Sequence, residues 1–172
     1  MKELMDKLSS YNIFNYLLPG VLFAAGAHAW TGYKFIQEQI AIGVFVYYFF
    51  GLIVSRVGSL AIEPLLRKTR FVHFSEYRDY VEACRSDQKI ELLSEVNNMY
   101  RTLASTVLLL VLTKGYEQAA GCYPVLDRWS PGVVVSLIFL LLLFSYRKQT
   151  NYITRRVSIA KEKHAAQGSG DA

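Results

Sequence analysis

The sequence has few of the residues from which catalytic and metal sites are built. Among 172 residues there are two cysteines and three histidines, and they lie far apart. Cys84 and Cys122 provide no disulfide framework and no metal ligand set, so we interpret both as passive small residues. The sequence has no G-x-S-x-G, P-loop or H-E-x-x-H pattern. We therefore expect a protein that is not an enzyme and has no cofactor and no metal site.

Charged side chains are missing from long parts of the chain. Hydrophobic residues make up 52% of the sequence. Most of them fall in four segments: 13–30, 40–54, 103–112 and 133–146. Nearly all Lys, Arg, Asp and Glu residues lie between these segments, a pattern typical of membrane-spanning helices rather than of a soluble core. The sequence predicts an all-α polytopic membrane protein, with four transmembrane helices in a single domain, 1–172.

The net charge of +5 does not indicate direct binding to nucleic acid, because basic segments alternate with segments poor in basic residues. The stretch 67–103 has seven basic residues beside six carboxylates, and the tail 147–172 has six beside two. The segments 31–39 and 114–131 have one and two basic residues. By the positive-inside rule, we expect both termini and the stretch 67–103 to be cytoplasmic and the connections 31–39 and 114–131 to face outward.

Two of the four segments have features that are unusual for a membrane span. The first contains Ala27-His28-Ala29, which resembles a signal-peptide cleavage site, but acids offset the preceding lysines and we interpret it as a span, with a helix disruption at Pro19. The run 103–112 is short, yet 99–116 rises about 27 Å as a helix, which is enough to cross with mild thinning of the bilayer. We expect the second span to end at Glu63 and Pro64, and the fourth to begin after Trp129 and Pro131.

Residues 67–101 form the longest polar insert, and we expect a cytosolic helical hairpin there. We predict that Ser75 caps the first helix, which runs to about Arg85. Ser86 or Asp87 is the predicted cap of the second helix, which continues into the third span. The shorter helix has an apolar stripe: Phe71, Phe74, Tyr77, Tyr80 and Val81. This stripe either packs against the inner ends of the spans or binds a cytosolic protein partner.

Three groups of residues are candidate sites. Small residues at four-residue spacing predict close helix packing, within one chain or in a homo-oligomer: Gly20, Ala24, Gly51, Ser55 and Ser59. Polar residues at the cytosolic depth predict an interhelical clamp or a ligand site: Asn12, Asn15, Asn97, Asn98, Tyr100 and Arg101. Basic residues beside the spans predict contacts with lipid headgroups: Arg56, Arg147, Lys148, Arg155 and Arg156.

No acidic or basic residue lies centrally in any predicted span, which disfavours a coupled transporter. The stretches LSSYNIFNYLLPGVLF and IELLSEVNNMYRTL resemble a family of small four-pass bacterial membrane proteins of anti-phage defence systems, such as the membrane subunit of Kiwa. This resemblance implies a protein of the bacterial inner membrane that acts as an oligomeric sensor or membrane-perturbing effector in a defence or stress module. A passive scaffold or assembly factor, and a small channel or transporter, are the alternatives that the residues leave open.

Overall fold

Every secondary-structure element of the described chain is a helix, so the predicted all-α class is confirmed. The computed structural model describes residues 13–168, with the backbone alone for Phe14 and for 163–168. The elements in chain order are η1 (Ile13–Leu17), α2 (Leu18–Trp30), α3 (Ile40–Val57), η2 (Gly58–Ile62), α4 (Glu63–Lys68), α5 (Tyr77–Ser86), α6 (Lys89–Cys122) and α7 (Pro124–Gly168). The two η elements are single π-helical turns.

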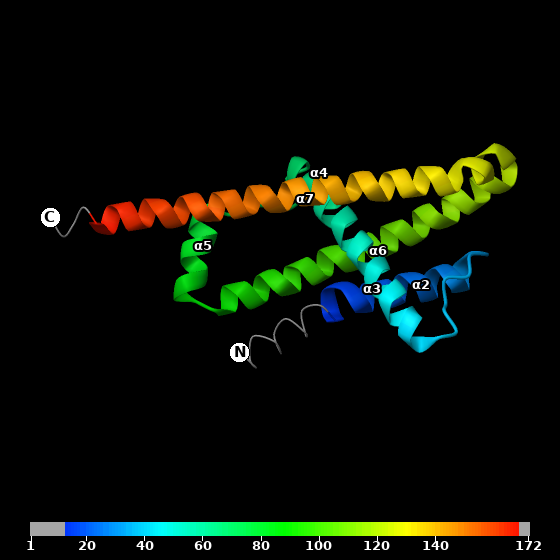
Figure 1. Cartoon of the computed structure of the whole chain (residues 1–172), viewed down its shortest axis with the longest axis horizontal. Coiled ribbons are helices and arrows are strands. Elements are labelled where there is room, and N and C mark those ends of the chain that lie inside the picture. The colour runs from blue at the N-terminus through cyan, green and yellow to red at the C-terminus, as the bar shows by residue number, and fades with distance from the viewer. Residues whose placement is uncertain (1–12, 169–172) are drawn as a thin grey trace.

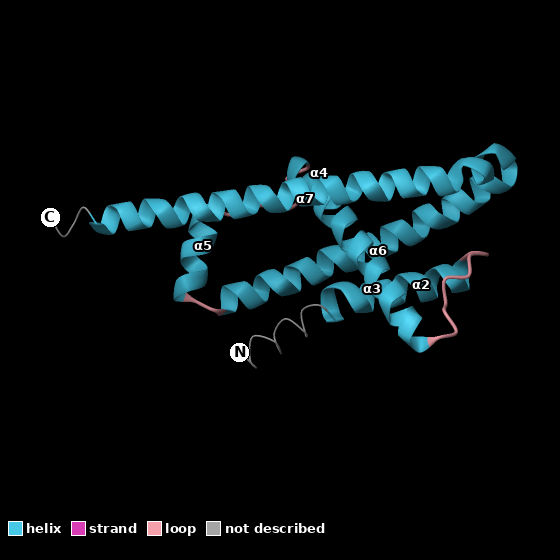
Figure 2. Ribbon diagram, viewed as in Figure 1, coloured by secondary structure: helices cyan, strands magenta, loops and turns pink. Residues whose placement is uncertain are grey.

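The helices alternate in direction. α2 and α6 run one way and α3 and α7 the other, with α3 crossing α6 obliquely (Figure 1). The loop 31–39 and the turn between α6 and α7 lie at one end of the molecule, and α5 lies at the other (Figure 2). Helices α6 and α7 diverge from their shared turn, and α5 lies between their far ends (Figure 1). This arrangement places the predicted insert at the opposite end from both predicted outer connections.

Two glycines let α2 and α3 approach closely. A Cβ atom on Gly20 would lie 1.7 Å from the carbonyl oxygen of Tyr47, and one on Gly51 would lie 1.7 Å from the carbonyl oxygen of Tyr16. Ala24 and Val54 are each 1% exposed in the same region. Because both obstacles are backbone atoms, neither position accepts a larger residue unless a helix moves.

Helix α6 turns a group of small hydroxyl residues towards the other helices. Thr102, Ser105 and Thr106 are buried, and each donates its hydroxyl hydrogen to the carbonyl four residues earlier. Thr102 Oγ1 also lies 3.4 Å from Ser55 Oγ on α3. These internal bonds satisfy the buried hydroxyls and let the backbones pack closely, as small polar residues do between membrane helices.

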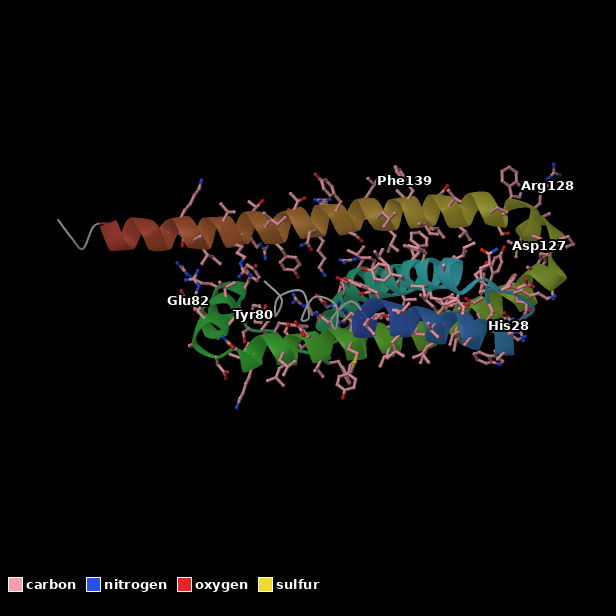
Figure 3. The ribbon with its side chains drawn as sticks, turned by 60° about the horizontal axis from the view of Figure 1, so that its bottom comes forward. His28, Tyr80, Glu82, Asp127, Arg128 and Phe139 are labelled. Carbon is pink, nitrogen blue, oxygen red and sulfur yellow. The ribbon has the colours of Figure 1, made fainter. Side chains whose placement is uncertain are left out.

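The apolar side chains of α7 have almost no partners within the chain. None of the residues in the most apolar stretch of α7 is buried within the chain. In the helical run Ile40–Lys68, 22% of the residues in the most apolar stretch are buried. These two runs are long and apolar enough to cross a membrane. Figure 3 shows Phe139 pointing away from the other helices, while Asp127 and Arg128 lie at the turn and Tyr80 and Glu82 at the opposite end. A soluble core helix would be mostly buried, so α7 has the exposure expected of a lipid-facing helix.

Helices continue past the predicted end of the second span and the predicted start of the fourth. Helix runs on through η2 and α4 to Lys68, beyond Glu63 and Pro64, with Pro64 in the first turn of α4. Helix α7 begins at Pro124 and contains Pro131, which leaves only Tyr123 between α6 and α7 in place of the predicted connection 114–131.

The caps of the insert differ from prediction in one of two cases. Helix α5 begins after Glu76 without a side-chain cap, so the cap predicted at Ser75 was wrong. At the start of α6, the carboxylate of Asp87 accepts the N–H of Lys89 at 2.9 Å, as predicted for the second helix. The π-helical turn Ile13–Leu17 directly precedes α2, the helix that contains Pro19.

Candidate functional site

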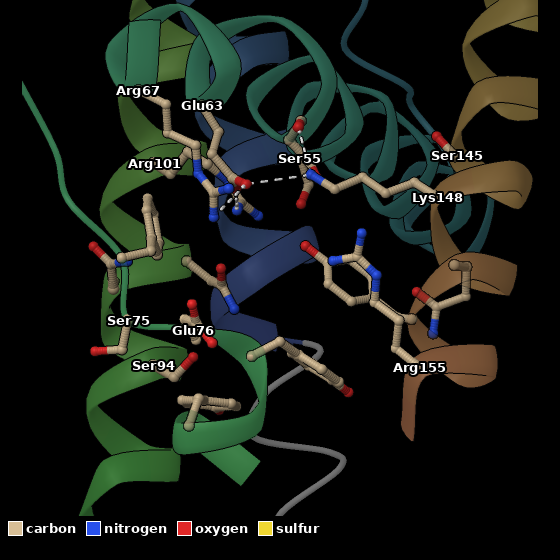
Figure 4. A pocket seen from close by; sticks show the side chains of 18 of the residues that line it. Ser55, Glu63, Arg67, Ser75, Glu76, Ser94, Arg101, Ser145, Lys148 and Arg155 are labelled. Atoms are coloured by element: carbon tan, nitrogen blue, oxygen red, sulfur yellow. Dashed lines mark hydrogen bonds and ion pairs between the residues drawn. The ribbon is translucent and has the colours of Figure 1, made fainter. Parts of the chain in front are cut away.

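A cleft of about 1460 Å³ opens between α6 on one side and α7 on the other, with the run α3, η2 and α4 above it and α5 below (Figure 4). Helix α5 forms its floor because the turn 87–88 brings α5 back between the diverging ends of α6 and α7. The cleft therefore lies at the end of the molecule that the charge pattern assigns to the cytoplasm.

Glu63 is the centre of the charged groups in the cleft. It is 8% exposed, and its carboxylate lies 2.5 Å from Arg101 Nη1 on α6 and 3.3 Å from Lys148 Nζ on α7. Arg67, one turn later on its own helix, lies 3.8 Å away. One carboxylate thus ties three elements together through three cations. The attraction is screened least in the least exposed pair, Glu63 with Arg101, where loss of one partner would leave the other charge largely buried without its counter-charge.

Lys148 reaches across the cleft from α7 to the end of α3. Its ammonium donates to the backbone carbonyl of Ser59 at 2.7 Å and to the Ser59 hydroxyl at 2.8 Å. The ammonium also lies 5.9 Å from the ring centre of Tyr152. The carbonyl of Ser59 is free to accept this bond because it lies in the π-helical turn η2, where the usual helical pairing is shifted.

Cations outnumber carboxylates around the cleft. Its lining includes six basic side chains, Arg56, Arg67, Arg78, Arg101, Lys148 and Arg155, and three acidic ones, Glu63, Glu76 and Glu162. Arg78 pairs with Glu162 at 2.6 Å, and Arg56 donates to the hydroxyl of Tyr16 at 3.2 Å. Such an excess within a concave wall produces a positive potential that attracts anions.

Two cationic side chains in the cleft have donors without a partner among the described residues. Within the described residues, Arg155 makes no ion pair, although Figure 4 shows its side chain reaching from α7 into the cleft. The Nε of Arg101 is buried and has no hydrogen-bond partner in the described part of the chain. A buried donor of this kind costs free energy unless a ligand or water accepts its hydrogen bond.

Aromatic rings form the floor of the cleft. Tyr77 packs against Tyr80 and Tyr152, with ring centres 6.5 Å and 5.7 Å apart, and Val81 is 4% exposed beneath them. Burial raises the pKa of the Tyr80 phenol, which keeps this hydroxyl protonated and able to donate. Part of the predicted stripe on the insert thus packs within the chain, whereas Phe71 remains 77% exposed.

The residues of the predicted clamp are only partly brought together. Asn97, Asn98 and Arg101 line the cleft, whereas Tyr100 is 64% exposed and lies outside it. Asn15 is buried beside the cleft, next to its lining residue Tyr16. Asn12 lies outside the described residues.

The other two groups of predicted site residues are the small packing residues and the basic headgroup contacts. The small residues Gly20, Ala24, Gly51, Ser55 and Ser59 are all buried within the chain. Of the predicted headgroup contacts, Arg56, Lys148 and Arg155 line the cleft, while Arg147 and Arg156 lie exposed on α7 outside it.

Sequence reasoning missed the role of Glu63 and Arg67. Their four-residue spacing and their position directly after an apolar run were signals of an ion pair near the membrane surface. The hydroxyl face of α6 was also missed, although Thr102, Ser105 and Thr106 follow helical spacing. Among the described residues no group of three or more His, Cys, Asp or Glu side chains could hold a metal ion.

Comparison with protein-family models, with curated proteins and with solved structures gave no match to this chain.

Proposed function

We propose that the chain is a non-enzymatic bacterial inner-membrane protein that crosses the bilayer four times. It acts as an oligomeric sensor or membrane-perturbing effector of a defence or stress module. Its insert, residues 67–101, engages a cytosolic protein partner. The observation that carries the proposal is the exposure of α7, in whose most apolar stretch no residue is buried by the rest of the chain. Lipid is the solvent that makes such a surface stable.

The lengths and directions of the other helices support four crossings. Together η1 and α2 span Ile13–Trp30, which corresponds to about 27 Å of helix. Helix α6 has 34 residues, or about 51 Å, which exceeds the ~30 Å hydrocarbon core. Because these helices alternate in direction with α3 and α7, α5 and the end of α7 lie at one end of the molecule and both connections at the other (Figure 1), an arrangement that supports the proposed crossings.

An exposed apolar stripe on α6 supports association of two copies. Leu92, Val96, Tyr100, Val107 and Val111 share one side of this helix, at successive spacings of four, four, seven and four residues, and all are exposed. The stripe faces away from the buried hydroxyl side. It extends into the predicted cytosolic part of α6, beyond the reach of lipid, where a second copy would cover Leu92 and Val96.

Exposed apolar residues of the insert support the proposal that it binds a protein partner. Phe71, Phe74 and Leu65 are 77%, 47% and 60% exposed. The guanidinium of Arg67 lies over the Phe74 ring at 4.1 Å, which holds that ring at the surface. Exposed aromatic and Arg groups in one place are typical of the centres of protein interfaces.

The two cysteines provide the topology test. Cys122 is exposed at the end of α6 and Cys84 lies on α5 at the opposite end. In spheroplasts, a membrane-impermeant maleimide should label Cys122 and not Cys84, and lysis should expose Cys84. Variants Cys84→Ser and Cys122→Ser assign each signal. Labelling of both cysteines before lysis, or recovery of the protein in the soluble fraction, contradicts the proposal.

Dye release separates the two forms of the proposed activity. Purified protein in liposomes loaded with carboxyfluorescein should release the dye if the chain perturbs membranes by itself. Retention of the dye at high protein loading would exclude the membrane-perturbing effector. The sensor, which transmits a signal through its partner, would then be the supported form.

A further inference from the structure

We propose that the cleft binds a phosphate group, held by Arg101, Lys148 and Arg155. The inference deepens the proposed function and rests on it in one respect, because a lipid headgroup reaches the cleft only if the helices cross the bilayer. Phosphate carried by an anionic phospholipid and free phosphate share this chemistry, and the experiment distinguishes the two sources.

The charge balance of the cleft calls for an anion. Glu63 is the carboxylate shared by Arg101, Lys148 and Arg67, so these three cations exceed it by two charges. Arg155 adds another cation without any carboxylate in ion-pair distance among the described residues. Cations held close together in a partly enclosed site repel one another, and a bound anion removes that repulsion.

The donors in the cleft match the geometry of a phosphate. Guanidinium groups bind phosphate oxygens with two parallel N–H donors, and an ammonium adds a point charge. Arg101 has a buried Nε that lacks a partner in the described chain, while Lys148 and Arg155 both extend from α7 into the cleft (Figure 4). Cations from α6 and α7 therefore line one cleft. Lys148 is held there by its bonds to Ser59 and Glu63 and contributes its charge, whereas the exposed side chain of Arg155 makes no ion pair among the described residues and has its donors available for an anion.

The size and walls of the cleft indicate a ligand larger than phosphate alone. About 1460 Å³ leaves room for a glycerol or sugar beside the phosphate. Leu52 on α3 and Leu142 on α7 line the side next to the apolar helices, whereas Tyr77 and Ser94 line the side next to the insert. A phospholipid would place its phosphate at the cations and its chains along the gap between α3 and α7.

Binding is measured on the full chain in an uncharged detergent, where membrane topology plays no part. The probes are sodium phosphate against sodium chloride at equal ionic strength, and dihexanoyl phosphatidylglycerol against dihexanoyl phosphatidylcholine. We expect a saturable rise in the unfolding temperature with one of the two anionic probes. Arg155→Gln should weaken that binding about tenfold or more, since a charge-assisted hydrogen bond is lost. Arg101→Gln should do the same.

Neighbouring arginines provide the matched controls. Arg147→Gln and Arg156→Gln remove the same charge from α7 outside the cleft, and each should change the affinity less than about twofold, as screened surface charges do. Arg155 makes no ion pair among the described residues, so Arg155→Gln should unfold at the wild-type temperature without ligand. Arg101→Gln loses its bond to Glu63. If that loss lowers the unfolding temperature without ligand, the affinity of Arg155→Gln is the measurement that tests the site.

The outcomes are distinct. Saturation by inorganic phosphate identifies a soluble phosphate ligand, and saturation by phosphatidylglycerol alone identifies a lipid headgroup. Absence of saturation by either probe overturns the proposal, as does equal weakening by the control variants. Failure of the cysteine-labelling experiment with retained binding would refute the four-pass topology and leave the phosphate site intact.

Discussion

Glu63 on α4 and Arg101 on α6 are 38 residues apart in the sequence, and their Oε2 and Nη1 atoms lie 2.5 Å apart at the wall of the cleft. The two side chains are 10% and 20% exposed. The pair fixes the end of the α3–η2–α4 run against the middle of α6, and Lys148 extends the link to α7 through the other carboxylate oxygen.

Replacing Glu63 should therefore destabilise the fold. Glu63→Gln leaves Arg101 and Lys148 without their shared counter-charge, and we expect the free energy of unfolding to fall by about 3 kcal/mol. The midpoint of SDS-induced unfolding in mixed micelles measures the change. Glu162→Gln is the matched control, because its partner Arg78 and Glu162 itself are both 56% exposed. That variant should lose less than about 1 kcal/mol, and equal losses would show that Glu63 has no special role.

The close approach of α2 and α3 makes a second prediction. Gly51→Ala and Gly20→Ala each place a Cβ atom against a backbone carbonyl of the facing helix, so each should lower the free energy of unfolding by about 1–3 kcal/mol. Gly115→Ala and Gly132→Ala have no atom within 4 Å of the new methyl group. They should be neutral or stabilising by up to about 1 kcal/mol, through helix propensity alone. The same unfolding assay compares all four, and similar effects would contradict the packing described here.

Hydrophobic patterning made the helices predictable, because uncharged runs and charged boundaries are local properties of the chain. The π-helical turn before α4 and the passage of α7 through Pro131 were not predicted, because a proline usually marks a helix boundary and the sequence alone does not show where a helix continues past one. The same holds for the site. Arg101 stood out as a basic residue at the membrane edge, but its pairing with Glu63 and that of Lys148 with Ser59, 89 residues away, require the folded arrangement.

The exposed stripe on α6 predicts a specific cross-link. In a background of Cys84→Ser and Cys122→Ser, the variant Val96→Cys should form a dimer with a short bis-maleimide in native membranes, because Val96 lies on the side proposed to face a second copy. Ser94→Cys, which lines the cleft instead, should stay monomeric. Gel electrophoresis after quenching reads the result. Dimer formation by Ser94→Cys and not by Val96→Cys would assign the contact between copies to another surface.

The connection 31–39 is fastened to the end of α6 by a group that titrates. The carboxylate of Glu117 accepts the N–H of Gly32 at 2.5 Å and pairs with Lys114 at 2.7 Å. The bond from Lys114, and then that from Gly32, lower the pKa of Glu117 below its ordinary value of 4.5. A lowered pKa means that the folded state binds the proton less readily, so this attachment is complete above the ordinary pKa and is lost as the pH falls through the lowered one.

Trp30, two residues before Gly32 and 52% exposed, can report the loss of that attachment. In a Trp129→Phe background, the emission of Trp30 should shift in one step as the pH falls below about 4.5. Glu117→Gln cannot titrate and should show no such step, while Glu38→Gln, on the same connection, should keep it. Because the carboxylate is near the surface, added salt should weaken the Lys114 contribution and move the step to higher pH. A step that persists in Glu117→Gln would assign the transition to another carboxyl group.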